Sequence, residues 1–246
     1  MVAGLQKHDV IAGNLANVDT PGFKRDIPIT GSFKQEMVKR LKGSEKTGQI
    51  SSVEIGGLGY GSYVHNVGSD YSQGPSIETQ GGLDLAIEGE GFFAVDSPSG
   101  ELYTRSGAFQ LSQSGTLTTV NNMPVLGTEG PVTIPQGTGK VEILADGTIL
   151  LDGVSHDRLK IISCDDPSLI RKLGNGLFKI PSENVREPRL DSFNIRQGFL
   201  EMSNVNSISE MVRMISGMRT YEACQKMVWA IDQTLDKTIN DVGRVV

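Results

Sequence analysis

Residues 207–242 read SISEMVRMISGMRTYEACQKMVWAIDQTLDKTINDV and carry the most regular helical pattern of the chain. Apolar residues recur there at gaps of three or four, which is the spacing of one helix face and is close to the coiled-coil repeat. Ser207 and Glu210 have the spacing of a capping box that would start the helix. The stripe consists of Ile208, Met211, Ile215, Met218, Tyr221, Cys224, Val228, Ile231, Leu235, Ile239 and Val242. The sequence therefore predicts a single helix of about 35 residues.

A helix of this length needs a surface to pack against. Ordering its backbone costs about 1–2 kcal/mol per residue, whereas burying each stripe side chain returns only about 1.5–3 kcal/mol. The balance is marginal when the stripe is buried and unfavourable when the stripe faces water. The stripe is interpreted either as ordinary core within its own chain or as a surface that meets other chains.

A second helical pattern lies at the N-terminus, in residues 2–18, where Leu5 and Leu15 recur near helical spacing. Thr20-Pro21-Gly22 would end it, because proline disfavours helix in the preceding residue and glycine supplies a turn. We expect the two terminal helices to pair in an antiparallel way. The N-terminal helix is too short to cover the whole stripe, so the remainder would meet other chains or the middle of the protein. A weaker helical pattern lies in residues 32–42.

The middle of the chain has the marks of β-structure. There are 30 glycines among 246 residues, which indicates many turns. Two apolar runs, 141–145 and 148–151, flank Asp146-Gly147, a preferred pair for a hairpin turn. The predicted fold is α+β, with paired, coiled-coil-like terminal helices flanking a β-rich middle domain. Its predicted divisions are an N-terminal helix and signature in 1–24, an extended, loop-rich segment in 25–82, a β-rich domain in 83–196, and a C-terminal motif with the long helix in 197–246.

Composition and charge argue against several functions. The 23 basic residues are scattered and outweighed by 29 acidic ones, so the concentrated positive face of a nucleic-acid-binding protein is not expected. Membrane insertion is not expected either, because no apolar run approaches the ~20 residues that a bilayer requires. The opening residues MVAGLQKHDV do not form a signal peptide, which indicates a cytoplasmic protein or export without a cleaved signal. Cys164 and Cys224 lie far apart and are interpreted as buried thiols.

Residue patterns for catalysis or ligand binding are also absent from the sequence. His8, His65 and His156 are far apart and have no partners at metal-ligand spacing. The glycines of 56–61 lack the spacing of a dinucleotide-binding loop, and there is no nucleophile elbow or Walker lysine. We therefore expect no catalytic residue, cofactor or metal. A secreted enzyme or binding module with a terminal helical hairpin stays open as the alternative to an assembly subunit.

Four segments resemble one protein family. Residues 11–24, IAGNLANVDTPGFK, are similar to the N-terminal signature of the flagellar rod and hook family, and residues 197–206, QGFLEMSNVN, to its C-terminal motif. Residues 83–93, LDLAIEGEGFF, and 103–107, YTRSG, are also familiar from rod proteins. Together these motifs span nearly the whole chain. Within the family the chain is most similar to the proximal rod protein, with the distal rod protein as the alternative.

The resemblance implies a non-enzymatic structural subunit of the flagellar basal-body rod. Such a subunit would be exported by the flagellar type III apparatus without a cleaved signal. It would assemble through its terminal helices, with other copies and with neighbouring axial proteins, into the torque-transmitting tube. The asparagines of the motifs can cap or bridge backbone beside the helix ends. The implied assembly interface consists of Leu5, Ile11, Asn14, Leu15, Asn17, Phe23, Asn204, Asn206, Ile208, Met211, Ile215, Met218, Val228, Ile231 and Leu235.

Overall fold

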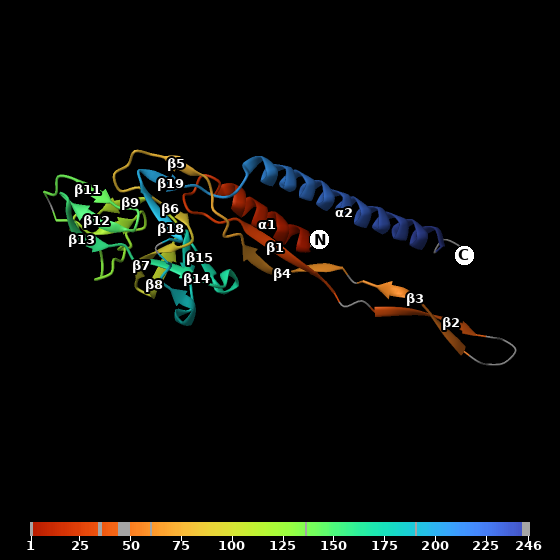
Figure 1. Ribbon diagram of the computed structural model, residues 1–246. Helices are drawn as coiled ribbons and strands as arrows, with labels where there is room; N and C mark the ends of the chain where they lie inside the picture. The colour runs from red at the N-terminus through yellow and green to blue at the C-terminus, as the bar shows by residue number, and fades with distance from the viewer. Residues whose placement is uncertain are drawn as a thin grey trace. The chain divides into compact units, whose positions relative to one another are not determined.

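The computed structural model describes residues 2–33, 36–43, 50–59, 61–135, 137–189 and 191–242 (Figure 1). Its helices are α1 (Val2–Ala16) and α2 (Ser207–Val242), with two short 3-10 helices at Pro167–Leu169 and Ser182–Asn184. The strands are β1 (Asp26–Ser32), β2 (Glu36–Gly43), β3 (Ile50–Leu58), β4 (Ser62–Ser69), β5 (Ser76–Glu78), β6 (Leu85–Gly89), β7 (Phe92–Ser97), β8 (Gly100–Thr104), β9 (Phe109–Leu111), β10 (Leu117–Thr119), β11 (Val141–Ile143), β12 (Thr148–Leu151), β13 (Val154–Arg158), β14 (Ile161–Cys164), β15 (Arg171–Gly174), β16 (Leu177–Lys179), β17 (Val185–Arg186), β18 (Phe193–Gln197) and β19 (Phe199–Glu201).

The chain forms two compact units, and each is described by itself. One, here called the body, consists of residues 13–25 and 69–210. The other, here called the terminal unit, consists of residues 1–12, 26–68 and 211–246. The body therefore contains residues 13–24 of the N-terminal signature, the whole β-rich middle and the first turn of α2.

The centre of the body is a six-stranded sheet with the order β15-β16-β8-β7-β14-β17. Successive side chains of a strand face opposite sides of a sheet, so Phe93 and Val95 of β7 join one apolar cluster while Phe92 and Ala94 join the other. Both faces of the sheet are thus covered. The larger cluster also takes in Leu85, Ile87, Phe193 and Ile195, which come from the paired strands β6 and β18.

The hairpin predicted at Asp146-Gly147 is confirmed. β11 pairs with β12 in antiparallel register, with Val141 opposite Leu151 and Ile143 opposite Ile149. Gly147 has a φ of 90°, which only glycine adopts at little cost. The Thr148 N–H donates to the Asp146 carboxylate at 3.0 Å, as turn chemistry leads one to expect.

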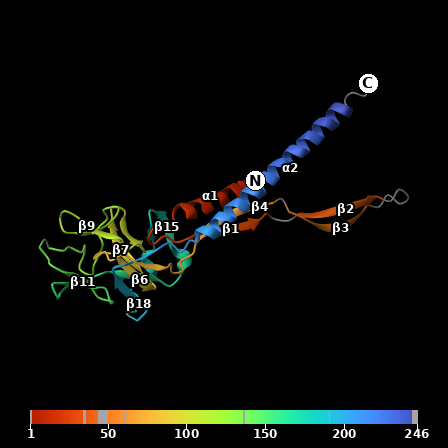
Figure 2. The ribbon, with the colours of Figure 1, turned by 90° about the horizontal axis from the view of Figure 1, so that it is seen from above.

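The terminal unit contains two separate two-stranded ribbons, β1 with β4 and β2 with β3 (Figures 1 and 2). The helical prediction for residues 32–42 is wrong, because Glu36–Gly43 forms β2 and pairs with β3 along its whole length. The partner strand lies seven or more residues downstream in the chain, outside the window in which helical periodicity is judged. Pairing between distant segments has therefore overridden a weak local preference.

The predicted coiled-coil pair of terminal helices is also wrong. The structure has one N-terminal and one C-terminal helix, but no seam of buried side chains joins them along the described residues. They approach at Gly217, where an added Cβ atom would lie 2.9 Å from His8 Nε2. Leu5 of α1 stays 47% exposed, and Ile215 and Met218 of α2 stay 54% and 58% exposed. Coiled-coil packing would have buried these positions.

The physical reason lies in the direction that the apolar residues of α2 face around the helix axis. A coiled coil alternates gaps of three and four residues, but Ile215, Met218, Tyr221 and Cys224 follow one another at three successive gaps of three. Each gap of three turns the stripe back by about 60° on a helix with 3.6 residues per turn. The apolar residues before and after this segment consequently lie on different sides of α2, and a single straight partner cannot cover them all.

The start of α2 differs from the predicted capping box. Asn206 is the cap, because its side chain accepts a hydrogen bond from the Ser209 N–H at 2.9 Å and its carbonyl accepts one from the Glu210 N–H at 3.0 Å. Glu210 is buried and serves another contact, described below. Cys224, interpreted as buried, is exposed on α2, and both cysteines are free thiols. Neither described helix has a long enough uncharged apolar stretch to cross a lipid bilayer.

Candidate assembly site

The N-terminal signature and the C-terminal motif meet in the body at a buried cluster of charges. Lys24 Nζ donates to Glu201 Oε1 at 2.6 Å, and Arg105 Nε donates to Glu201 Oε2 at 2.6 Å. None of these three side chains is more than 5% exposed. One carboxylate therefore joins three segments, residues 11–24, 103–107 and 197–206, that the sequence places far apart.

The remaining donors of the cluster are satisfied by backbone groups. Lys24 Nζ also donates to the Ser72 carbonyl at 2.8 Å. The Arg105 guanidinium donates to the carbonyls of Ile87 at 2.9 Å and Gly89 at 2.6 Å, and to that of Gly91. Burial of charge is tolerated only when each ion is paired and hydrogen-bonded. The cluster meets that condition, so it holds the three segments in one arrangement.

A second set of contacts links the N-terminal signature to the start of α2. The Arg25 N–H donates to Asn204 Oδ1 at 2.8 Å, while its guanidinium lies 3.3 Å from Asp70 Oδ2 and 3.8 Å from Glu210 Oε1. Asn204 Nδ2 in turn donates to the carbonyls of Asp70 and Ser72. Glu210 sits in the first turn of α2, where a negative charge is favoured by the helix dipole. Arg25 therefore ties that turn to the N-terminal signature.

The signature approaches the body closely at Gly22. Its N–H donates to the Glu201 carbonyl at 2.8 Å, and its φ is 70°. A Cβ atom here would collide with the backbone of Arg105 and Ser106. The next residue, Phe23, is buried, with Lys172 Nζ 3.6 Å from its ring centroid. Glycine at this position is thus required both by conformation and by space.

Burial and charge act in opposite directions on Glu201. Burial, the largest single influence, would raise the pKa of the Glu201 carboxyl, but the charges of Arg105 and Lys24 and the hydrogen bonds from Lys24 and Gly74 outweigh it. The pKa consequently lies below its ordinary value of 4.5. Burial lowers the pKa of Lys24, against the attraction of Glu201. Glu201 stays ionised between its two cations across the neutral pH range.

This arrangement predicts how the stability of the body depends on pH. A carboxyl whose pKa is lower in the folded state contributes stability that is present above the unfolded pKa and is lost as pH falls through the folded pKa. The free energy of unfolding should therefore fall below about pH 4.5. Glu201→Gln should make that decline shallower, although Asp70, whose pKa is lowered chiefly by a hydrogen bond from the Ser72 backbone, will still contribute. Urea unfolding at pH 7 and pH 3 measures this. Equal declines in the two proteins would contradict it.

The predicted interface residues fall into two groups. Near the cluster, Asn204 and Phe23 make the contacts above, Asn14 is buried, and Asn17 donates to the Gly13 carbonyl at 2.8 Å. On α1, Leu5 is exposed whereas Ile11 and Leu15 are half-buried. On α2, Asn206 caps the helix, and the apolar positions are 47–72% exposed: Ile208, Met211, Ile215, Met218, Val228, Ile231 and Leu235.

The charged residues of the cluster were missed by reasoning from the sequence. Lys24, Arg105 and Glu201 all lie inside the segments that resemble family motifs. The presence of a charged residue inside each of these motifs could have suggested a functional role for it. No rule of sequence spacing, however, predicts that residues this far apart in the chain pair with one another. Only the folded structure shows that these three residues lie together.

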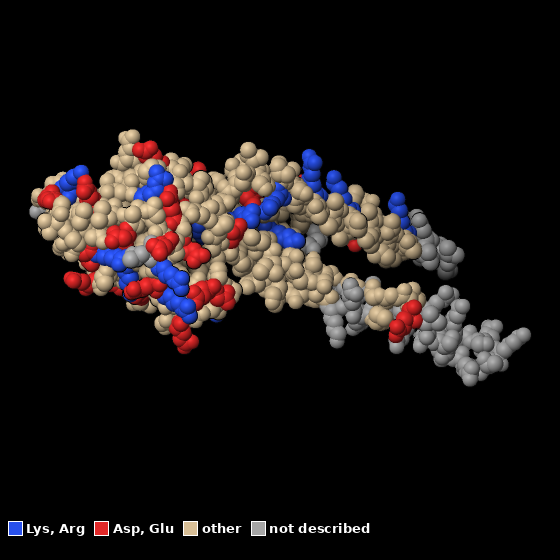
Figure 3. Space-filling view, viewed as in Figure 1, with Lys and Arg blue, Asp and Glu red and all other residues tan. Residues whose placement is uncertain are grey.

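Among the described residues there is no candidate metal site, and the face shown in Figure 3 has no large region of a single charge. Among the described residues, no group of three or more His, Cys, Asp or Glu side chains is placed to hold a metal ion. Figure 3 shows Lys and Arg side chains mixed with Asp and Glu over the face of the body that it presents, while most of α2 in this view is neither acidic nor basic.

Three family descriptions match consecutive parts of the chain. Residues 1–24 match the flagella basal body rod protein family, residues 86–151 match the flagellar hook protein FlgE/F/G D1 domain, and residues 196–241 match the flagellar basal body rod FlgEFG protein C-terminal family. The first and third of these contain Lys24 and Glu201, and the second contains Arg105. The buried cluster therefore joins one residue from each matched segment.

Individual relatives are similar over almost their full length. The flagellar basal-body rod protein FlgF of Caulobacter vibrioides is 32% identical, over 96% of this chain and 91% of the relative. The flagellar basal-body rod protein FlgG of Buchnera aphidicola subsp. Schizaphis graminum is 33% identical, over 93% of this chain and 91% of the relative. The Escherichia coli FlgF protein is 31% identical, over 93% and 89%.

Proposed function

The chain belongs to the flagellar basal-body rod proteins of the FlgF/FlgG type, and from this premise we propose how it assembles. It is a structural subunit of the flagellar rod, without enzymatic activity, and it associates with other flagellar axial proteins. We infer that it also assembles with copies of itself, and that the exposed apolar side chains of α2 form the contact.

One observation carries this proposal. Eleven large apolar side chains of α2 are exposed, between Ile208 at 72% and Ile239 at 68%. Burying one such side chain is worth about 1.5–3 kcal/mol. An exposed apolar surface larger than soluble monomers usually carry marks an interaction site. A 36-residue helix with so little of its surface covered is therefore best explained as a helix that packs against other chains.

The buried cluster has a second role in this proposal. A subunit that transmits torque must keep the segments of its body together under load. The Arg25 contacts with Asp70 and Glu210, and the Lys24–Glu201 pair beneath them, hold the first turn of α2 on the body. We propose that this cluster keeps the chain ends and the middle of the body together under load.

The proposal also covers where the protein acts. We place it in the periplasmic part of the rod, reached through the flagellar export apparatus without a cleaved signal. Within the rod we propose the proximal segment, with the distal segment as the alternative. Electron microscopy of a deletion strain tests this, because the axial structure should end where the missing subunit begins.

Replacing Ile231 by Asp should abolish swimming. The side chain is 52% exposed, so the substitution should leave the isolated chain folded, but in an assembled rod it would bury an unpaired charge, which costs several kcal/mol. Complementation of a deletion strain, scored by swimming and by purified basal bodies, measures the effect. Lys237→Asp, which also places an acid on exposed α2, is the control and should swim normally. Normal swimming of Ile231→Asp would argue against α2 as the assembly surface.

A further inference from the structure

Half of the methionines of this protein lie on α2. The chain has eight methionines, and four of them fall within the 36 residues of this helix: Met211, Met214, Met218 and Met227. Methionine is flexible and polarisable, and it is over-used on surfaces that bind other proteins. We propose that the exposed methionines of α2 are a peroxide-sensitive modification site, whose oxidation keeps a free subunit from assembling. This inference rests on the proposed function and names a way in which that function is regulated.

Three of these thioethers are open to a small oxidant. Met211, Met218 and Met227 are 47%, 58% and 65% exposed. Met214 is half-buried, and in the body Met123 packs against the larger apolar cluster. A peroxide must reach the sulfur atom to oxidise it, so exposed methionines react ahead of covered ones. In the single chain, oxidation should therefore fall on the three exposed positions of α2 before it reaches the body.

The exposed methionines lie on two opposite sides of the helix. Met211 and Met218 are seven residues apart, which at 3.6 residues per turn places them within about 20° of each other. Met227 follows Met218 by nine residues and lies about 180° away around the helix axis. Ile231, four residues after Met227, shares the side of Met227. A partner chain that packs on either of these two sides therefore covers at least one exposed thioether.

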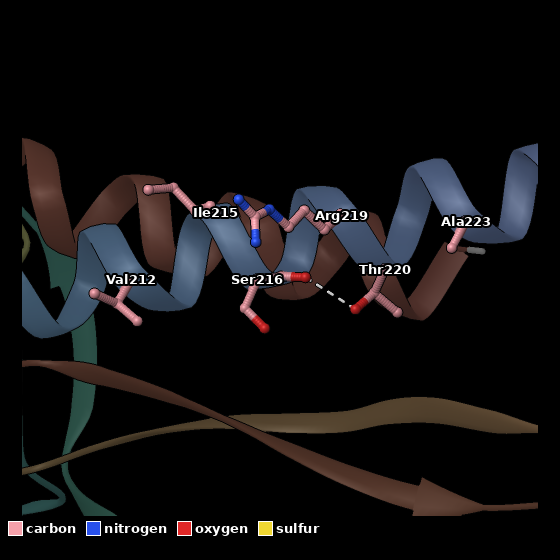
Figure 4. A pocket seen from close by; sticks show the side chains of 6 residues that line it. All are labelled: Val212, Ile215, Ser216, Arg219, Thr220 and Ala223. Atoms are coloured by element: carbon pink, nitrogen blue, oxygen red, sulfur yellow. Dashed lines mark hydrogen bonds between the residues drawn. The ribbon is translucent and has the colours of Figure 1, made fainter.

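The surface of α2 between Met211 and Met227 offers few hydrogen bonds to a new polar group. A groove in this stretch is lined by Val212, Ile215, Ser216, Arg219, Thr220 and Ala223 (Figure 4). The dashed line in Figure 4 marks the hydrogen bond that the Thr220 hydroxyl already donates to the Ser216 carbonyl at 2.9 Å. Among the residues that line the groove, Arg219 is the only charged one. Most sulfoxide oxygens brought into a contact here would therefore have no donor.

The chemistry needs no reactant other than the peroxide. A lone pair of the thioether sulfur attacks one oxygen of hydrogen peroxide, the O–O bond breaks, and an S–O bond forms. The sulfur is oxidised by two electrons, and the second oxygen leaves with both hydrogens as water. The product, methionine sulfoxide, is polar where the thioether was apolar, and this change disrupts methionine-rich interfaces. Because a polar group buried without a hydrogen bond is unfavourable, each sulfoxide in the contact should weaken association by about tenfold or more.

Treatment of the full chain with hydrogen peroxide tests the proposal. Sedimentation velocity before and after treatment measures association, mass spectrometry locates the oxygen atoms gained, and circular dichroism checks that the chain stays folded. The unchanged chain should form species that grow with concentration, and after treatment it should need a concentration about tenfold higher or more to form them. A variant with Met211→Leu, Met218→Leu and Met227→Leu should associate equally before and after treatment, because leucine has a similar volume and no sulfur.

Two controls identify the sulfur atoms that are responsible. Met37 is 58% exposed on β2, so it should also be oxidised, yet Met37→Leu should leave the peroxide sensitivity of association unchanged. Cys224 is an exposed thiol on α2 itself. A sulfenic acid or disulfide at a cysteine is reversed by a thiol, whereas methionine sulfoxide is reversed by methionine sulfoxide reductases. Association of the treated chain should therefore return with the reductases and not with dithiothreitol.

The outcomes separate this inference from the proposed function. If the unchanged chain associates but peroxide does not weaken it, or weakens the triple leucine variant equally, the modification site is wrong and self-assembly stands. The same conclusion follows if Met37→Leu abolishes the sensitivity, if dithiothreitol restores association, or if treatment removes the helical circular dichroism, because another sulfur or unfolding would then be the cause. If the untreated chain is monomeric at every concentration, both self-assembly and this modification site are wrong.

Discussion

Glu201→Leu is expected to lower the free energy of unfolding of the body by about 3–5 kcal/mol. The substitution removes the carboxylate that faces both Lys24 and Arg105 at 2.6 Å and leaves two buried cations without their counter-charge. Breaking a buried pair is far more costly than its net contribution would indicate, because the surviving charge cannot reach water. Urea unfolding at pH 7, followed by near-ultraviolet circular dichroism, measures the change.

The matched control is the exposed pair of Glu88 and Arg196. Their side-chain atoms lie 2.8 Å apart, which is similar to the distances in the buried cluster, but the side chains are 36% and 41% exposed. Exposed pairs contribute about 0–1 kcal/mol, so Glu88→Leu should change stability by no more than that. If the two substitutions had equal effects, burial would not be the source of the strength of the cluster.

Gly22→Ala is the second substitution with a large expected effect, a loss of roughly 2–4 kcal/mol. Alanine at a φ of 70° is strained, and its Cβ would overlap the backbone of Arg105 and Ser106. The chain cannot move away without losing the hydrogen bond from the Gly22 N–H to the Glu201 carbonyl. The same unfolding measurement detects the loss, and Lys24 would be displaced from Glu201 with it.

Gly13→Ala is the control within the same signature. Gly13 lies in α1, and a Cβ atom added there meets nothing within 4 Å. Alanine is favoured over glycine inside a helix by roughly 0.5–1 kcal/mol, so this variant should be as stable as the unchanged chain or slightly more stable. A similar loss in both variants would mean that the close approach at Gly22 is not what requires glycine.

Local patterns predicted part of this protein well. The long C-terminal helix follows from residues 207–242, and the Asp146-Gly147 hairpin from the turn chemistry of two residues. The family and the structural role follow from four short motifs, and the comparisons confirm both. In each case the deciding information lies within a few residues or a few helical turns.

The errors share a different cause. Glu36–Gly43 is a strand because Ile50–Leu58 pairs with it, and Asn206 caps α2 because the chain enters the helix one residue earlier than the capping box indicates. The coiled-coil pair was predicted from gap lengths taken one at a time. The three successive gaps of three after Ile215 rotate the stripe, and only the sum of the gaps reveals that.

The helix α2 and its apolar stripe follow from the sequence, because helical periodicity is a property of neighbouring residues. That Lys24, Arg105 and Glu201 form one buried cluster follows from the fold alone. The interaction of two charges depends on their distance and on the exclusion of water between them. For residues 177 positions apart, as Lys24 and Glu201 are, both quantities are set by the packing of the whole body.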